Sequence, residues 1–302
     1  MSLSEDLRNE LAAIAPRQEC DRLAELSGLF HAAGTVHLRG RGEVSVHLDL
    51  ASSAVARRAF SLLRGFGVES EIRTYRRRAF DRGTRYQLHV PGDGHALQVL
   101  NEAGVLTAGL APLERPPKRV VARACCRSAY LRGALLGGGS LSGPRSPHLE
   151  LRAATVAGAE FLAGLAAKEG GRLTISDRGR HAVAYAKGAE AIGDVLAAAG
   201  ASDAVLVLEE RAVLGATRAA ANRLANADHA NLVRTSRAAH AQLRALERLD
   251  LDELPPKLRE IAELRLRHPT LSLRELALKC EPPATKSATH RRLRKLVRLA
   301  EP

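Results

Sequence analysis

The side chains whose types and spacing most clearly indicate a chemical role lie in the last sixth of the chain. Between Lys286 and Arg298, basic and polar residues recur at helical spacing, with Arg291, Arg294 and Arg298 at i, i+3 and i+7. Such a face can neutralise phosphates, and its first turn can reach base edges in a major groove. We expect base contacts from Lys286, Ser287, Thr289, His290 and Arg291, and phosphate contacts from Arg294, Lys295 and Arg298.

No other set of residues has the spacing that catalysis or metal binding usually shows. The four cysteines, Cys20, Cys125, Cys126 and Cys280, lack zinc-ligand spacing, so structural thiols in a reducing compartment are expected. The eleven histidines form no HExxH pair, and Gly137–Gly139 lacks the lysine of a phosphate loop. The sequence therefore predicts no metal and no cofactor.

Three short helices are predicted to present the basic residues. They cover 257–267, 273–279 and a third segment that begins near Thr285 or Ser287 and ends at Leu299. Proline-containing turns separate them, and Ser272-Leu-Arg-Glu275 has the pattern of a capping box. This pattern is typical of a helix-turn-helix, whose third helix enters the major groove. A small helical packing domain is the alternative.

The first two thirds of the chain contain an internal repeat. Three ordered matches carry it: Leu26–Gly34 with Leu131–Gly139 at an offset of 105 residues, His47–Leu50 with His148–Leu151 at 101, and Val99–Gly104 with Val195–Gly200 at 96. The shrinking offsets indicate short deletions in the loops of the second copy.

Each copy is predicted to run helix, strand, strand, helix, strand, strand, helix. Period-3.6 patterns, period-two patterns and capping residues place helices at 22–34, 52–64, 93–104, 156–169 and 188–199, and strands at 43–50, 69–76, 84–90, 147–153, 171–177 and 180–186. The expected fold is α+β, a pseudo-twofold tandem repeat followed by a helical linker and an all-α domain.

The predicted domains are a first repeat at 1–111, a second at 119–210, a helical linker at 211–253 and the helix-turn-helix at 254–302. The linker has no proline and, after Gly215, no glycine, which favours one or two helices. Secondary DNA contacts could come from Asn222, Arg223 and Asn226 in the linker, and from the basic turn Arg76, Arg77 and Arg78. A solvated helix face and a solvated hairpin tip are the alternatives.

Charge favours a polyanionic partner. The chain carries 46 Lys and Arg against 33 Asp and Glu, a net charge of +13. Only about +4 of it lies in residues 1–210, which is modest for a major DNA-binding surface. No run of 18 apolar residues predicts a membrane span, and the charged N-terminus does not resemble a signal peptide. A cytoplasmic protein that binds double-stranded DNA is expected.

The repeated Leu-x-Gly-x-x-x-x-x-Gly segment resembles the LAGLIDADG homing-endonuclease family. There, paired helices pack through small residues, and each ends in an acid that binds the metal ions used for strand cleavage. Those positions correspond here to Ala33 and Gly138, and the other Asp-like positions to His31 and Leu136. The resemblance therefore implies a non-catalytic scaffold. An active endonuclease, or an N-terminal module that binds a protein or ligand, are the alternatives.

A degenerate pair of this kind followed by a helix-turn-helix resembles the WhiA family of bacterial regulators. The similar segments are Cys125–Gly133, Asn222-Arg-x-x-Asn226, Leu254–Pro269, Ser272–Leu276 and Lys286–Lys295. The resemblance implies a nucleoid-associated transcription factor, not an enzyme, with roles in sporulation, cell division and chromosome segregation. A protein partner, either another transcription factor or polymerase, stays open.

Overall fold

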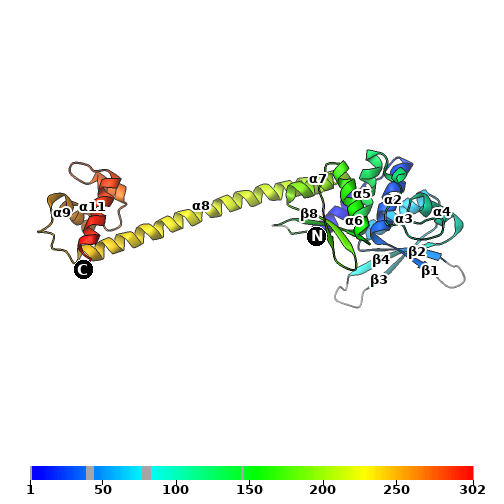
Figure 1. Cartoon of the computed structure of the whole chain (residues 1–302), viewed down its shortest axis with the longest axis horizontal. Helices are drawn as coiled ribbons and strands as arrows, with labels where there is room; N and C mark the ends of the chain where they lie inside the picture. The colour runs from blue at the N-terminus through cyan, green and yellow to red at the C-terminus, as the bar shows by residue number, and fades with distance from the viewer. Residues whose placement is uncertain (1, 39–43, 77–82, 144–145, 302) are drawn as a thin grey trace. The chain divides into compact units, whose positions relative to one another are not determined.

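The computed structural model describes residues 2–38, 44–76, 83–143 and 146–301 (Figure 1). The chain forms two compact units, Met1–Gly215 and Ala216–Pro302. The division falls inside a single helix, α8 (Ser202–Leu246). In the part of the chain that is described, no helix combines the length and the apolar character needed to cross a bilayer.

The first unit contains the predicted repeat, and its α+β order is confirmed. After α1 (Leu3–Ala13), the first copy comprises α2 (Glu19–Ala33), β1 (Gly34–Leu38), β2 (Val44–Leu50), α3 (Ser53–Gly65), β3 (Glu71–Arg76), β4 (Thr84–Pro91) and α4 (Gly94–Glu102). A short 3-10 helix, η2 (Lys118–Val121), precedes the second copy. That copy comprises α5 (Ala124–Gly138), β5 (Gly139–Ser142), β6 (His148–Ala153), α6 (Val156–Lys168), β7 (Thr174–Asp177), β8 (Ala182–Lys187) and α7 (Ala189–Ala199).

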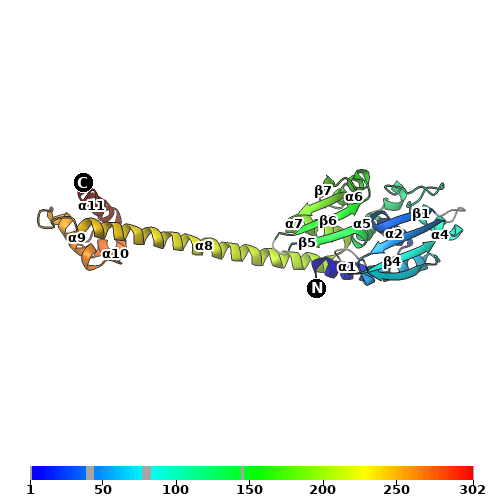
Figure 2. The same cartoon turned by 90° about the horizontal axis from the view of Figure 1, so that it is seen from below.

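Each copy contributes one four-stranded antiparallel sheet. The strand orders are β1-β2-β4-β3 and β5-β6-β8-β7, so the two sheets have the same topology. Gly34 pairs with Leu48 in the first sheet and Gly139 pairs with Leu151 in the second, so the antiparallel pairing of the first two strands begins at equivalent glycines but is shifted by two residues relative to the repeat offset of 101. Helices α2, α3, α5 and α6 cover one face of the sheets (Figures 1 and 2). The period-two pattern buries Val46 and Leu48 on that face.

Helices α2 and α5 pack closely because glycine lies at their crossing. A Cβ atom on Gly28 would come within 2.2 Å of the Tyr130 carbonyl oxygen. A Cβ on Gly133 would come within 2.1 Å of the Glu25 carbonyl oxygen. Residues 25 and 130 are themselves 105 positions apart, so the contact repeats itself across a pseudo-twofold axis. The axis predicted from the repeat therefore passes between these two helices.

A buried charge cluster joins three helices beside this crossing. The Glu25 carboxylate is fully buried and accepts hydrogen bonds from Arg58 of α3 at 2.6 and 3.1 Å. Arg132 of α5 donates to the same carboxylate at 2.9 Å. Two guanidinium groups therefore compensate one carboxylate in a region that excludes water, which fixes the relative positions of the helices.

Helix α1 and the early start of α8 are the main differences from the sequence prediction. The first turn of α8 lies at Ser202, nine residues before the predicted linker. The Glu10 carboxylate of α1 accepts hydrogen bonds from the backbone N–H groups of Asp203 and Ala204 at 2.7 and 2.9 Å. A distant side chain thus satisfies amides that a helix start leaves free, which local spacing could not reveal. The predicted linker, 211–253, is one continuous helix as far as Leu246, where α8 ends, and its residues 247–253 are not helical.

The second unit comprises the C-terminal part of α8 and a three-helix domain that follows it. It contains α9 (Pro256–Arg267), α10 (Leu273–Leu278) and α11 (Lys286–Leu299) around a core that includes Leu258, Ile261, Leu276, Leu293 and Leu296. The capping box predicted at Ser272 and Glu275 is present: the side chain of each residue accepts a hydrogen bond from the backbone N–H of the other. Local signals therefore predict this domain well.

Candidate nucleic-acid interface

Helix α11 is positioned by its cap and by its apolar stripe. The Thr285 hydroxyl accepts a hydrogen bond from the Ala288 N–H at 3.2 Å, so Thr285 is the N-cap and Ser287 lies inside the helix. Leu293 and Leu296 are buried against α9 and α10. Burial of this stripe turns the opposite face of α11 toward solvent.

The solvent-facing side of α11 gathers the predicted DNA-binding residues. The exposed residues are Lys286, Ser287, His290, Arg291, Arg294, Lys295 and Arg298. Across the described residues, the lysine and arginine side chains of this set form no ion pair with an acid. We call this set the α11 face. Its uncompensated charge would attract a polyanion.

Thr289 is the exception, because its side chain is buried, which argues against its predicted base contact. Its side chain is fully buried between the exposed positions 287 and 290. The residue lies four positions before Leu293, and residues four apart share one face of a helix. Thr289 therefore belongs to the buried face of α11. The pattern of apolar residues in the sequence did not show that this face extends to position 289.

Two arginines hold the domain together rather than facing solvent. Arg292 forms a 3.8 Å ion pair with Glu260 of α9. Arg265 is buried, and its guanidinium donates to the carbonyl oxygens of Leu271 at 2.7 Å and Pro269 at 3.3 Å. Burial lowers the pKa of Arg265 from its ordinary value. These contacts fix the turn between α9 and α10.

The predicted secondary DNA contacts come from elements other than α11. Asn222, Arg223 and Asn226 are exposed along α8. Arg76 is exposed at the end of β3. Arg77 and Arg78 lie outside the described residues. A role for any of these residues stays a prediction.

The ends of α2 and α5 are closely packed where an endonuclease would hold metal ions. Ala33 and Gly138 are the last residues of the two helices. A Cβ on Gly138 would lie 3.2 Å from the Ala32 Cβ and 3.2 Å from the Arg152 carbonyl oxygen. A Cβ on Gly137 would lie 3.4 Å from the Ala33 Cβ. Small residues thus fill the space in which two carboxylates and their metal ions would have to fit.

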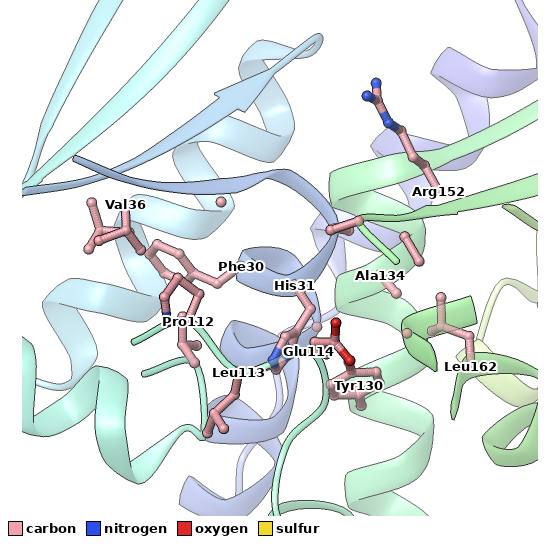
Figure 3. A pocket seen from close by; sticks show the side chains of 18 residues that line it. Phe30, His31, Val36, Pro112, Leu113, Glu114, Tyr130, Ala134, Arg152 and Leu162 are labelled. Carbon is pink, nitrogen blue, oxygen red and sulfur yellow. The ribbon is translucent and has the colours of Figure 1, made fainter. Parts of the chain in front are cut away.

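A pocket lies beside these helix ends (Figure 3). It is lined mainly by apolar residues, and Glu114 is the one carboxylate among its lining residues. His31 and Tyr130 face it, whereas Arg152 is directed away from them. Burial lowers the pKa of His31 to about 4, so this imidazole is neutral at physiological pH. One carboxylate and a neutral imidazole do not make the two-metal centre of a nuclease.

Several charged side chains on the outer faces of the two sheets form ion pairs. Asp49 on β2 forms a 3.1 Å ion pair with Arg85 on β4. Glu150, its counterpart on β6, lies 2.9 Å from His148 and 3.4 Å from Arg178. Such pairing reduces the positive charge that these faces offer to phosphates, although Arg152 and Lys187 are exposed there without an ion pair among the described residues.

Comparisons with known proteins agree with this architecture. The chain matches the family models of the WhiA N-terminal LAGLIDADG-like domain over residues 19–106, the WhiA LAGLIDADG-like domain over 127–218 and the WhiA C-terminal HTH domain over 221–300. It is 36% identical over 307 residues to a probable cell division protein WhiA of Heliobacterium modesticaldum, covering all of this chain and 96% of the relative. The corresponding protein of Symbiobacterium thermophilum is 35% identical over 309 residues, covering 100% and 98%.

Solved structures support the fold. The crystal structure of full-length DUF199/WhiA from Thermatoga maritima matches with a TM-score of 0.59 and 23% identity, covering 99% of this chain and 98% of that one. The crystal structure of an N-terminal LAGLIDADG domain of DUF199/WhiA matches with a TM-score of 0.50 and 19% identity, covering 65% and 89%. Three consecutive domain matches and full-length relatives above 30% identity show that the chain belongs to the WhiA family.

Proposed function

We propose that this protein is a sequence-specific regulator that binds double-stranded DNA through the α11 face. The observation that carries the proposal is the set of exposed basic side chains on one side of the third helix of a helix-turn-helix, without acid partners among the described residues. A helix of this kind fits the major groove, and its cations can neutralise phosphates on both sides.

The two ends of α11 have different roles in this proposal. Lys286, Ser287, His290 and Arg291 lie on the first two turns, where recognition helices contact base edges. Arg294, Lys295 and Arg298 follow toward the C-terminal end and hold phosphates. Base contacts then determine sequence preference, and phosphate contacts determine most of the affinity and its dependence on salt.

The first unit acts as a non-catalytic scaffold. The small residues at Ala33 and Gly138 and the single carboxylate of the adjacent pocket support this role, because metal-dependent strand cleavage needs acids at the pseudo-twofold axis. The residues predicted to add weak contacts are Asn222, Arg223, Asn226 and Arg76.

The biological role that we propose follows the relatives. Proteins that match this chain over its whole length are named probable cell division proteins. We infer regulation of cell division genes by a cytoplasmic, nucleoid-associated protein, extended to sporulation and chromosome segregation where the organism has these programmes. A second transcription factor or polymerase would be the protein partner of such a regulator.

Selection of genomic fragments by the full chain tests the proposal. Arg291→Ala and Arg294→Ala should each weaken binding to the selected fragments, by about 10-fold or more where a charge-assisted contact is lost. Arg291→Ala should also relax the base preference at one position, whereas Arg294→Ala should weaken all sequences alike. Arg57→Ala is the matched control, because it also removes an exposed arginine, from α3 of the first unit.

Two results would overturn the proposal. One is binding by both α11 variants that equals that of the unaltered chain. The other is magnesium-dependent cleavage of the selected fragments, which would assign an endonuclease activity to the first unit. Circular dichroism of each variant establishes that the domain is folded before binding is compared.

A further inference from the structure

Four side chains of metal-binding type meet at the first turns of α2 and α5. One ligand atom from each of Cys20, Asp21, Cys125 and Cys126 lies within 4.8 Å of the others. The sulfurs of Cys125 and Cys126 are 3.9 Å apart, and the Cys20 sulfur is 3.6 Å from an Asp21 carboxylate oxygen. Zinc–sulfur bonds of about 2.3 Å give a tetrahedron with edges of about 3.8 Å. The donor atoms therefore lie close to tetrahedral spacing.

The cluster follows the pseudo-twofold symmetry of the fold. Cys20 and Cys125 are 105 residues apart, as are Asp21 and Cys126, and this is also the offset of the crossing glycines. Helix α2 begins at Glu19 and α5 at Ala124, so the four donors occupy the second and third positions of their helices. Each repeat thus supplies two donors from equivalent places, and the donors meet across the axis.

The surrounding backbone suits anionic ligands. The first N–H groups of a helix have no partner within it and form the positive end of the helix dipole. Among the described residues, neither N-cap side chain, Gln18 or Arg123, caps its own helix. Two positive helix ends therefore favour thiolates and a carboxylate at this point, which are the forms that bind cations.

The cluster is also accessible to an ion. Cys126 is buried, Cys20 is half-buried and Cys125 is exposed, so an ion can enter from solvent past Cys125. The Gln18 side-chain oxygen accepts hydrogen bonds from the thiols of Cys20 at 3.5 Å and Cys125 at 3.9 Å. Rotation of Gln18 away from these two sulfurs would free them to bind a cation. Without an ion, burial raises the pKa of the Cys126 thiol to about 12, so binding has to displace its proton.

We propose that Cys20, Asp21, Cys125 and Cys126 form a structural zinc site that links the two repeats. Three sulfur donors and one oxygen donor favour Zn²⁺ over Mg²⁺ or Ca²⁺, which prefer oxygen ligands alone. On binding, each ligating thiol releases its proton to solvent, and no electron is transferred. The ion connects segments that are 105 residues apart, at the opposite end of the helix pair from Ala33 and Gly138. Its role is therefore stability of the helix pair rather than strand cleavage.

Cobalt substitution of the full chain is the sharpest test. The chain is freed of metal under reducing conditions and titrated with Co²⁺. We expect visible bands of tetrahedral Co²⁺ and a near-ultraviolet thiolate-to-cobalt band that saturate at one ion per chain and disappear when Zn²⁺ is added. Elemental analysis should give one zinc per chain, and one equivalent of Zn²⁺ should raise the unfolding midpoint of the first unit by several degrees.

Single-residue variants assign the ligands. Cys20→Ala and Cys125→Ala should each weaken Co²⁺ binding by at least tenfold, and Asp21→Asn should do so with little effect on folding. Cys280→Ala is the matched control, because this buried cysteine belongs to the core of the second unit. The control should bind one Co²⁺ like the unaltered chain.

Three results would overturn the proposal. They are a titration without the thiolate-to-cobalt band, a Cys280→Ala variant that loses binding as much as Cys20→Ala does, and an unfolding midpoint that Zn²⁺ leaves unchanged. A Cys20–Cys125 disulfide that forms in air while reduced protein binds no Co²⁺ would also count against a metal site.

Discussion

At the scale of single residues, Thr289 shows that one helical turn can contain both exposed residues available to DNA and a residue buried in the domain core. Its neighbours Ser287 and His290 are exposed, while Thr289 is fully buried. Its hydroxyl has no hydrogen-bond partner among the described residues. A buried hydroxyl without a partner costs free energy, so this side chain is not optimal for stability.

We therefore expect Thr289→Val to raise the free energy of unfolding of the second unit by about 1 kcal/mol. Valine has nearly the same shape and removes the unpaired hydroxyl. DNA affinity should not change, because the side chain does not reach solvent. Chemical denaturation and DNA titration of the same variant measure both quantities. Loss of sequence selectivity would show instead that Thr289 contacts DNA.

We expect His31 to make the stability of the first unit sensitive to acid. Burial lowers its pKa to about 4 in the folded chain, from an ordinary value of 6.5. Between these values the unfolded chain binds the proton and the folded chain does not. Stability is therefore complete above pH 6.5 and falls as the pH drops toward 4, by up to about 3 kcal/mol.

The variant His31→Leu should reduce this loss between pH 6.5 and 4, because it removes the titrating group. His229→Gln changes an exposed histidine on α8 and is the control, with no expected change in slope. Denaturation midpoints at several pH values give the result. An unchanged pH slope in His31→Leu would mean that another group causes the acid sensitivity.

At the scale of elements, the α2–α5 pair depends on glycine at its crossing. Gly133→Ala would place a Cβ atom 2.1 Å from a backbone oxygen, so the helices would have to separate. We expect a loss of about 1–3 kcal/mol in the free energy of unfolding. Gly164→Ala in α6 meets no atom within 4 Å and should instead stabilise that helix by up to about 1 kcal/mol. Equal effects from both variants would contradict close packing at the crossing.

At the scale of the whole molecule, the two units divide the charge unequally. Residues 1–215 carry 28 basic and 23 acidic residues, and residues 216–302 carry 18 and 10. Ion pairs such as Asp49–Arg85 compensate part of the charge of the first unit. The second unit should therefore dominate the electrostatic part of DNA binding.

The dependence of DNA affinity on salt measures that division. Each phosphate contact contributes about 0.9 to the slope of log affinity against log salt concentration. Arg294→Ala and Arg298→Ala should each reduce the slope by about 1, and the double variant by about 2. Arg57→Ala in the first unit should leave it unchanged. An equal reduction by Arg57→Ala would show that the first unit also holds phosphates.

Much of this architecture can be predicted from the amino-acid sequence. The repeat at an offset of 105 residues predicts the pairing of α2 with α5, and the capping box at Ser272 predicts the start of α10. Helix α1 is not among the predicted elements, because its buried stripe consists of only Leu7 and Leu11 in a charged segment. The predicted linker begins nine residues after the true start of α8, because Glu10 of α1 provides the cap of that helix.

The proposed metal site and the buried threonine lie beyond such local signals for different reasons. The spacing of the cysteines along the chain does not indicate a metal site, because the proposed zinc site takes two of its ligands from each repeat. The repeat itself carries a signal, since Cys20 and Cys125 share the offset of the crossing glycines. Burial of Thr289 has only a weak signal, its place four residues before Leu293, because a polar residue at the edge of an apolar stripe can be either packed or exposed.

The sequence by itself determined the order of elements, the paired helices without catalytic acids and the basic third helix. Hydrophobic periodicity and capping residues depend only on neighbouring residues, and the repeat can be found by aligning the two copies. Only the tertiary structure decided the partners of Glu25, the burial of Thr289 and the meeting of Cys20, Asp21, Cys125 and Cys126. These contacts and this burial depend on surfaces that are distant in the sequence. Water is excluded from between those surfaces only when the two repeats, and the three helices, have packed.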